Sequence, residues 1–297
     1  MNASNSRELK LYEDKCLCGS GQLLLDCCLK DSRPPRITAR TGRRNRKCYA
    51  AAFSDCSNSI SREHYITEGV LKLIGDPITV GGFPWQGGKE RTVGTKALTS
   101  KILCERHNSA LSSLDQVGIR FFDELRVTRF ERPSSEVIVC EQTSLFRGEM
   151  IELWMLKVLC GLLVSGNAPD RSGSSIKVAL PPVWLAILFG YQPMPPGWGL
   201  WMRAGIGLVS SGARPESISV IYENGVLNGF IIILGHLGFV LVMNQPPDVK
   251  AGTLLEDCTY RPAQIEIEGA LRKDNLRIFW ERTGDERRIV IAQTSLQ

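Results

Sequence analysis

The run ILCERHNSALSSLD, residues 102–115, joins a short apolar stretch to three side chains that can bind metals. Cys104 and His107 are separated by two residues, which is a spacing typical of zinc ligands. Asn108 follows at once, and a helical pattern continues through NSALSSLDQVGIRFFDELRVTRF. The stretch therefore predicts a short strand that ends in a zinc-binding turn and leads into a helix.

Two cysteines upstream, Cys48 and Cys56, can complete a tetrahedral zinc set with Cys104 and His107. The interval between Cys48 and Cys56 is wider than the usual spacing of paired zinc ligands, which is about two to four residues. Cys48 can instead be a small buried hydrophobe, in which case Cys140 completes the site. Cysteines that sit singly among apolar neighbours are expected as buried free thiols: Cys140, Cys160 and Cys258.

The sequence REHYI, which contains Glu63 and His64, lies between the two cysteine pairs. This order of residues resembles the HNH endonuclease family, whose ββα-metal fold uses zinc to clamp a hairpin onto a helix. The resemblance spans about residues 48–115. It implies that Glu63 binds the catalytic metal, that His64 is the general base, and that Asn108 is the second ligand of a Mg²⁺ or Mn²⁺ ion.

Three features depart from that family's pattern. His107 stands where the family usually has a cysteine, and the family's middle asparagine falls on Thr99. The insertion from Lys72 to Ala97 is longer than a minimal hairpin. In addition, neighbouring side chains of a regular strand point to opposite faces, so Glu63 and His64 are expected at a strand end or bulge. The alternative is a hydrogen-bonded core histidine beside a surface glutamate.

A second cysteine cluster lies near the start of the chain, in the order C-x-C-x8-C-C. Four thiolates so close together form a nearly complete zinc set, and a segment this short needs the metal in order to fold. The cluster resembles the SEC-C motif, over about residues 15–29. The resemblance implies docking to a protein partner or to nucleic acid. The predicted ligands are Cys16, Cys18, Cys27 and Cys28.

The segment SRPPRITARTGRRNRK contains two prolines and no acidic residue, which favours a basic linker. Each contact between a cation and a phosphate releases a counterion, so the segment can give sequence-independent affinity for nucleic acid, with DNA as the expected partner. A solvated charged linker without a ligand is the alternative. The candidate phosphate-binding residues are Arg36, Arg40, Arg43, Arg44, Arg46 and Lys47.

The composition fits a cytoplasmic protein. Ten cysteines, without an apolar export signal in the first residues, favour metal binding over disulfides, because cytosolic thiols are kept reduced. The longest apolar stretch, residues 230–243, is shorter than the roughly 18 residues of a membrane span and is interrupted by Gly235 and His236. We therefore expect two buried strands there and no membrane partner.

The expected fold class is α+β, with four parts. Residues 1–32 form the zinc arm, 33–47 the basic linker, 48–135 the HNH-like ββα-metal module, and 136–297 a C-terminal domain of unknown role. That domain is predicted to contain a strand at 136–140, helices over 147–166 and from Pro182, and a mainly antiparallel sheet. The predicted sheet strands are SISVIY, VLNGFIII, LGFVLVM, QIEIE, LRIFWE and RRIVIA.

Other side chains receive lesser roles. His236 is expected in a turn. Asp115 is expected to be a solvated charge on the helix surface, and the alternative is that it contacts and orients the residues that bind the metal. Five tryptophans are expected in the core, with a role as base-stacking platforms as the alternative: Trp85, Trp184, Trp198, Trp201 and Trp280. The sequence thus predicts a metal-dependent endonuclease with two structural zinc ions. A non-catalytic nucleic-acid-binding protein with a degenerate HNH fold, or an adaptor, is the alternative.

Overall fold

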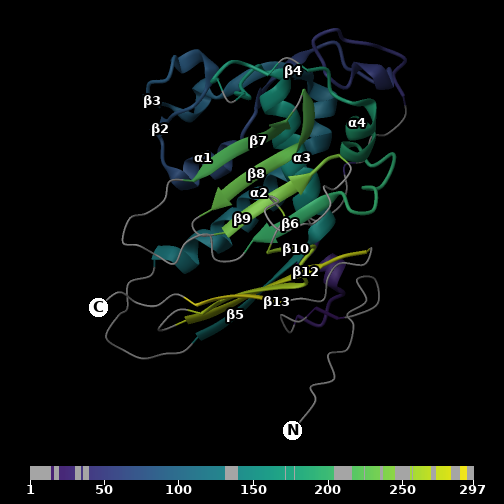
Figure 1. Cartoon of the computed structure of the whole chain (residues 1–297). Coiled ribbons are helices and arrows are strands. Elements are labelled where there is room, and N and C mark those ends of the chain that lie inside the picture. The colour runs from purple at the N-terminus through teal and green to yellow at the C-terminus, as the bar shows by residue number, and fades with distance from the viewer. Residues whose placement is uncertain are drawn as a thin grey trace.

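The computed structural model (Figure 1) describes the chain in segments. These are residues 15–16, 20–30, 35, 40–130, 140–170, 172–176, 178–203, 216–223, 225–234, 237–244, 255, 257–268, 272–281 and 288–292. The fold is mixed helix and sheet, as the α+β prediction requires.

A hairpin and a long helix form the part of the fold that resembles a ββα unit. Strand β1 (Ile60–His64) pairs antiparallel with β4 (Thr99–Cys104), and helix α2 (Glu105–Phe130) follows β4 without a break. The insertion between the two strands contains helix α1 (Glu68–Ile74) and a small hairpin of β2 (Ile78–Val80) and β3 (Arg91–Val93). Short 3-10 turns lie at Leu24–Asp26, Ala51–Phe53, Pro84–Gln86 and Thr95–Ala97.

The remaining helices and strands follow in chain order. They are β5 (Cys140–Arg147), α3 (Gly148–Val164), α4 (Pro182–Leu188), β6 (Gly199–Arg203), β7 (Ser217–Glu223), β8 (Val226–Leu234), β9 (Leu237–Val242), β10 (Cys258–Tyr260), β11 (Gln264–Glu268), β12 (Arg272–Phe279) and β13 (Arg288–Ala292). The predicted helices and the six predicted sheet strands lie within these bounds or differ by a few residues at the ends. Of the strand expected at 136–140, only Cys140 falls among the described residues.

The strands of the C-terminal half form two sheets, where the sequence predicts one mainly antiparallel sheet. One has the order β10-β6-β9-β8-β7 and is antiparallel throughout, and the other has the order β13-β11-β12-β5. In the second sheet, β11 pairs parallel with β13, and β12 pairs parallel with β5. The alternating pattern of a strand indicates which face is buried but not which strand is its neighbour, so the division into two sheets was not predictable.

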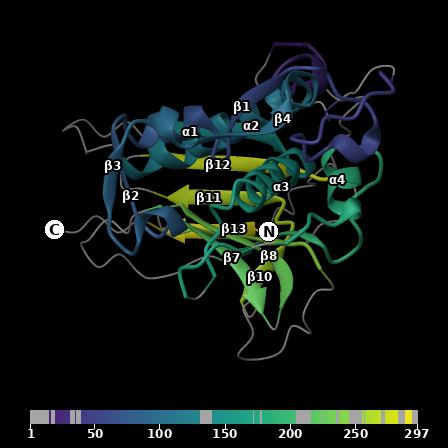
Figure 2. The same ribbon diagram turned by 90° about the horizontal axis from the view of Figure 1, so that it is seen from above.

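Helices α2 and α3 pack together and cover one face of the five-stranded sheet (Figures 1 and 2). Their close approach depends on Gly118, where a Cβ atom would lie 2.1 Å from the Trp154 indole nitrogen. One hydrophobic cluster includes residues from both sides of position 135, such as Phe121 of α2 and Met155 of α3. Side chains of α3 are therefore packed directly against the hairpin–helix unit.

The N-terminal arm rests on the four-stranded sheet. Leu24 and Leu29 form a small cluster with Leu145 of β5. Arg120 of α2 donates one hydrogen bond to the carbonyl of Cys28 at 2.7 Å and another to that of Leu145 at 2.9 Å. The arm is thus tied to the body by both apolar contacts and hydrogen bonds.

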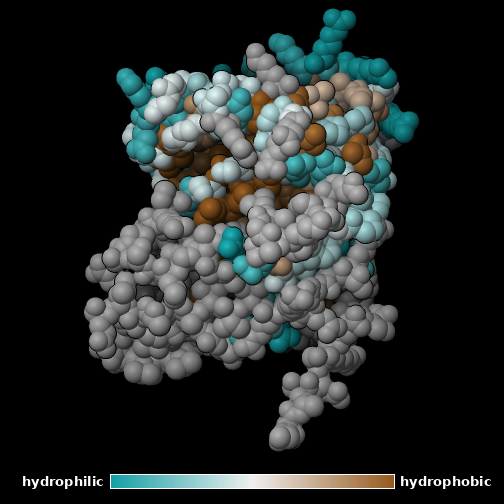
Figure 3. All heavy atoms as spheres, viewed as in Figure 1, coloured by the Kyte–Doolittle hydropathy of each residue, from teal (hydrophilic) through white to brown (hydrophobic). Residues whose placement is uncertain are grey.

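The other face of the five-stranded sheet carries a second small hydrophobic cluster around Val240, Val242 and Leu255. Hydrophobic atoms are visible on this side of the molecule, in the area where Figure 1 draws strands β7 to β9 (Figure 3). Within the described segments, no helix combines the length and the apolar character that crossing a bilayer requires.

Candidate metal centre and active site

Cys48, Cys56, Cys104 and His107 come together as one buried cluster, and their ligand atoms all lie within 4.8 Å of one another. The Nδ1 atom of His107 is 3.4 Å from the Cys48 sulfur, 3.9 Å from that of Cys56 and 3.1 Å from that of Cys104. Tetrahedral zinc, with bonds of about 2.3 Å to sulfur and about 2.0 Å to nitrogen, places such ligand atoms roughly 3.5 Å apart. The cluster therefore fits a metal ion such as zinc.

Backbone amides support the sulfur atoms of this cluster. Although burial raises the pKa of the Cys104 thiol, hydrogen bonds from the backbone of His107 and Ser57 offset it, and the pKa lies below its usual value. The backbone amide of Ala50 likewise bonds to Cys48, whose pKa burial nevertheless raises. Amide donors around the sulfur atoms favour the thiolate form, which is the form that binds a metal.

The participation of Cys48 answers the question that the sequence left open. Cys48 lies in the cluster in spite of its wide interval from Cys56, because the turn at Ala51–Phe53 folds the intervening chain back. The side chain of Cys140 lies outside the described residues. Cys160 is buried, as expected, whereas Cys258 is only half-buried.

Glu63 and His64 are the last two residues of β1 and both line one pocket. The pairing of β1 with β4 shifts between Ser61 and Glu63, and His64 is the last residue of the strand. The extra residue of this shift is on β4, and it precedes Glu63, so the strand end at His64 is the feature that ends the regular alternation. Thr99, which occupies the position of the family's middle asparagine, pairs directly with His64, and its hydroxyl donates to the carbonyl of Lys96 at 3.0 Å.

Glu63, His64 and Asn108 line one polar pocket of about 360 Å³, together with Arg62 and Asp115. Glu63 and His64 come from the end of β1, and the other wall is helix α2. Asn108 donates a side-chain hydrogen bond to the Glu63 carboxylate. The three residues that the sequence singled out therefore share one site, at the end of the helix that carries His107.

Lys157 of α3 is a residue of this site that the sequence analysis missed. It is buried, with 5% of its side chain exposed, and its ammonium group lies 2.6 Å from Glu63 Oε1 and 2.5 Å from Asp115 Oδ2. Asp115 also accepts a hydrogen bond from the Thr67 hydroxyl at 2.8 Å, and that hydroxyl accepts one from the Trp154 indole at 3.0 Å. Asp115 is therefore part of a buried network, where the sequence analysis favoured a solvating role.

A signal for Lys157 was present in the sequence. Lys157 lies three or four residues from Leu153 and Trp154 and next to Val158, so it falls on the apolar face of the predicted helix. The pattern therefore placed a charged residue on the face that is expected to be buried. A buried lysine needs a carboxylate partner. The sequence could not show which carboxylates these were.

Burial and charge set the protonation states in the pocket. Burial lowers the pKa of His64, so its ring is neutral at neutral pH and can accept a proton. Burial alone would lower the pKa of Lys157, but the carboxylates of Glu63 and Asp115 raise it above its ordinary value, which keeps the ammonium charged. Burial raises the pKa of Glu63, against the opposing effect of Lys157.

The donor atoms of the pocket suit a hard divalent cation. Glu63 and Asp115 provide carboxylate oxygens, and Asn108 provides an amide oxygen, which are the ligand types of Mg²⁺ and Mn²⁺. The His64 Nε2 atom is buried and has no hydrogen-bond partner among the described residues. Because His64 lines the pocket, this nitrogen is the candidate proton acceptor for a water molecule that enters beside it.

Three cysteines of the N-terminal arm, Cys16, Cys27 and Cys28, also lie within 4.8 Å of one another through their sulfur atoms. The hydroxyl of Ser20 donates to the Cys27 sulfur at 3.0 Å. The predicted fourth ligand, Cys18, lies outside the described residues. The described part of the arm thus forms a three-thiol cluster that can hold a metal.

The basic segment runs along the surface of the cluster formed by Cys48, Cys56, Cys104 and His107. The amide of Thr41 donates to the buried carboxylate of Asp55 at 3.0 Å, and the amide of Cys56 donates to the carbonyl of Arg43 at 3.0 Å. The side chain of Arg44 donates to Ser54 at 2.8 Å. Arg36 lies outside the described residues. The exposed candidates are Arg40, Arg43, Arg44, Arg46 and Lys47.

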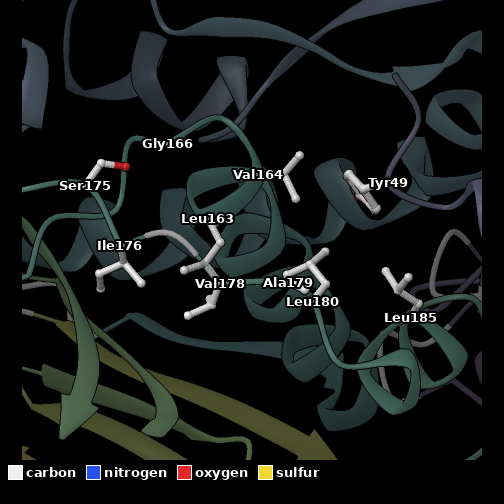
Figure 4. Close-up of a pocket in the computed structure, with 10 residues that line it drawn as sticks. All are labelled: Tyr49, Leu163, Val164, Gly166, Ser175, Ile176, Val178, Ala179, Leu180 and Leu185. Atoms are coloured by element: carbon white, nitrogen blue, oxygen red, sulfur yellow. The ribbon is translucent and has the colours of Figure 1, made fainter. Parts of the chain in front are cut away.

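A larger cavity of about 510 Å³ lies elsewhere, between α3 and α4 (Figure 4). Leu163, Val164 and Ile176 are among its mainly apolar lining residues, and the side chain of Ser175 points towards it. It brings together no cluster of acids and bases. The polar pocket at His64 is therefore the better candidate for catalysis.

Two remaining predictions concern residues away from the site. His236, predicted in a turn, lies outside the described residues. Trp184 is buried as predicted, and Trp198, Trp201 and Trp280 pack against the core clusters. The prediction for Trp85 was wrong, because 41% of this residue is exposed.

Comparison of the chain with protein-family models, curated proteins and solved structures finds no match.

Proposed function

We propose that the chain is an HNH-like endonuclease that hydrolyses phosphodiester bonds of DNA with Mg²⁺ or Mn²⁺. The observation that carries the proposal is the pocket in which Glu63, His64 and Asn108 meet beside a four-ligand metal cluster. Metal-dependent hydrolysis of a phosphodiester needs a general base and oxygen ligands for a divalent ion. In the proposed enzyme, one hairpin–helix unit carries both, and a structural zinc site holds that unit together. The proposal includes two structural zinc ions, one in each cysteine cluster.

In the proposed reaction, His64 Nε2 takes a proton from a water molecule in the pocket. The water oxygen then forms a bond to phosphorus, and the bond from phosphorus to the leaving oxygen breaks. Glu63 and Asn108 would hold the divalent ion, which stabilises the charge that develops on the phosphate and the leaving oxygen. Arg62, which is exposed and lines the pocket, is placed to contact a neighbouring phosphate.

The exposed basic segment supports the choice of a polyanionic substrate. Five exposed cations lie beside the cluster of Cys48, Cys56, Cys104 and His107, and helix α2 carries residues of both this cluster and the proposed catalytic pocket. They can hold the backbone of a nucleic acid without reading its sequence. Docking of a protein partner through the SEC-C-like arm is a separate, additional role that we propose for the described three-thiol cluster.

A second candidate function is a nucleic-acid-binding protein without catalysis. It is favoured by the contact between Lys157 and Glu63 Oε1, because the ammonium group already neutralises a carboxylate that a metal would need. The two functions differ in what the pocket does when a divalent cation is added. In the nuclease, Glu63 and Asn108 would still hold the divalent ion through oxygens that Lys157 does not contact, whereas in the binder no divalent ion would bind in the pocket.

The deciding experiment compares wild type with His64→Ala on plasmid DNA, single-stranded DNA and RNA, with Mg²⁺ or Mn²⁺. We expect cleavage by wild type and its loss in His64→Ala, with zinc content and DNA affinity unchanged. Asn108→Ala should lose part of the activity and regain some of it at higher metal concentration. Equal trace activity in wild type and His64→Ala would favour the non-catalytic binder.

A further inference from the structure

The insertion between β1 and β4 presents an aromatic side chain at the surface on a rigid loop. The turn at Pro84–Gln86 is held by Gln86, which is buried. Its side chain accepts a hydrogen bond from the Phe83 amide at 2.8 Å and donates one to the carbonyl of Val80 at 2.7 Å. Trp85, inside this fixed turn, is nevertheless 41% exposed. A tryptophan kept in water by a rigid loop is available for contact with a ligand.

A row of aromatic rings runs from Trp85 through Phe83 to Tyr65, the chain neighbour of His64. The rings of Trp85 and Phe83 are stacked, with centroids 5.8 Å apart and planes inclined by 10°. Phe83 in turn meets Tyr65 edge-on at 5.9 Å, and Tyr65 also has a side-chain hydrogen bond with Trp85. Tyr65 directly follows His64 in the chain. The exposed indole is thus fixed relative to the proposed general base.

The charges around the indole fit a polyanion. The guanidinium of Arg91 lies 5.9 Å from the centre of the Trp85 ring. Lys89, Arg91 and Lys96 are exposed on the insertion, which also carries the exposed acids Asp76 and Glu90. Asp76 accepts a hydrogen bond from the Thr95 amide, beside Lys96, so Lys89 and Arg91 are the cations nearest the indole loop. An aromatic face beside cations is the arrangement that binds an unpaired nucleotide, because the base stacks on the ring while the phosphate meets the cation.

We infer that Trp85 and Arg91 form a binding site for an unpaired nucleotide of the substrate, with the base stacked on the indole. This inference rests on the proposed binding of nucleic acid and adds a substrate class to it. A blunt duplex hides the faces of its bases within the stack, so the site favours single strands, flaps or bulges. The insertion that departs from a minimal HNH hairpin is therefore the element that selects the substrate.

The test measures binding of the full chain, without added divalent cation, to labelled single-stranded DNA, to single-stranded RNA and to a blunt duplex of the same sequence. The variants are Trp85→Leu, which keeps apolar bulk, and Trp85→Phe, which keeps an aromatic ring. Tyr191→Leu is the matched control, because Tyr191 is 50% exposed and packs on Phe53, outside the insertion.

We expect Trp85→Leu to weaken single-strand binding roughly ten-fold, the size of one lost base–aromatic stack, and Trp85→Phe to weaken it less. Duplex binding, and all binding by Tyr191→Leu, should change by less than about two-fold. Comparing the affinity for single-stranded RNA with that for single-stranded DNA shows whether the site distinguishes ribose from deoxyribose. The inference is overturned if Trp85→Leu binds single strands like wild type, or loses single strands and duplex equally.

Arg91→Gln, at an exposed position, tests the same site if Trp85→Leu does not fold. It should weaken single-strand binding and flatten the slope of log affinity against log salt by about 0.7, the contribution of one phosphate contact on a single strand. Unchanged binding and salt dependence would overturn the inference. Failure of the nuclease proposal is separate, since it would leave no cleavage by wild type but would not remove a Trp85-dependent preference for single strands.

Discussion

The ammonium group of Lys157 lies 2.6 Å from the carboxylate of Glu63, although the two residues belong to α3 and β1. The same ammonium group lies 2.5 Å from Asp115, so one cation holds two acids of the pocket. Without it, two carboxylates at one site would repel each other and would also repel a phosphate. Helix α3 is thus part of the candidate active site and not only a neighbour of it.

This contact predicts the cost of removing the lysine. Lys157→Met should lower the free energy of unfolding by about 3–5 kcal/mol, because it leaves a buried carboxylate without its cation. The control is Lys72→Met, which removes an exposed lysine paired with Glu68 on α1 and should cost less than about 1 kcal/mol. Denaturant titration of both variants measures the difference. Equal small costs would mean that Glu63 is neutral or hydrated in the folded protein.

The pH dependence of cleavage follows from the environment of His64. Burial lowers its pKa from the ordinary value of 6.5, so the neutral base persists below that pH. Activity should therefore be retained as pH falls to 6.5 and should be lost only below it, as the ring takes up a proton. A profile of kcat/KM against pH checks the position of the acid limb. An acid limb above pH 6.5 would contradict His64 as the base in this environment.

The metal content provides a prediction that does not depend on catalysis. The purified chain should contain about two zinc ions, one for each cysteine cluster. Cys104→Ser should lose one zinc and unfold the hairpin–helix unit, whereas Cys16→Ser should lose the other and loosen only the arm. Cys160→Ser, which alters a buried cysteine outside both clusters, should keep both ions. Elemental analysis and circular dichroism distinguish these outcomes, and a wild type without zinc would refute both sites.

The basic segment should contribute affinity without specificity. Changing Arg43 and Arg44 to glutamine should weaken binding to all DNA sequences alike. It should also flatten the slope of log affinity against log salt by roughly two, since each phosphate contact contributes about 0.9. Arg277→Gln, at an exposed position of β12 in the four-stranded sheet, is the control and should leave the slope unchanged. If both variants change the slope equally, binding is spread over the surface.

The sequence by itself determined the local features. The spacing of Cys104 and His107 indicated a pair of zinc ligands, because ligands two residues apart are brought together by a short turn. The sequence left Cys48 and Cys140 open as the remaining ligand, and the structure places Cys48 in the cluster. Alternation and helical periodicity located α2, α3, α4 and the strands of the C-terminal half, since each pattern depends only on near neighbours. The adjacency of Glu63 and His64 required a strand end or a bulge, and the structure ends β1 at His64.

Only the tertiary structure decided which distant residues meet. The pattern placed Lys157 on a buried face but could not name Glu63 and Asp115 as its partners, because that contact depends on the packing of α3 against α2 and β1. It also could not show that Trp85 lies outside the core, since this follows from the buried Gln86 that turns the loop outward. Local chemistry follows from neighbours in the chain, whereas burial and charge pairing follow from surfaces that come together only when the chain is folded.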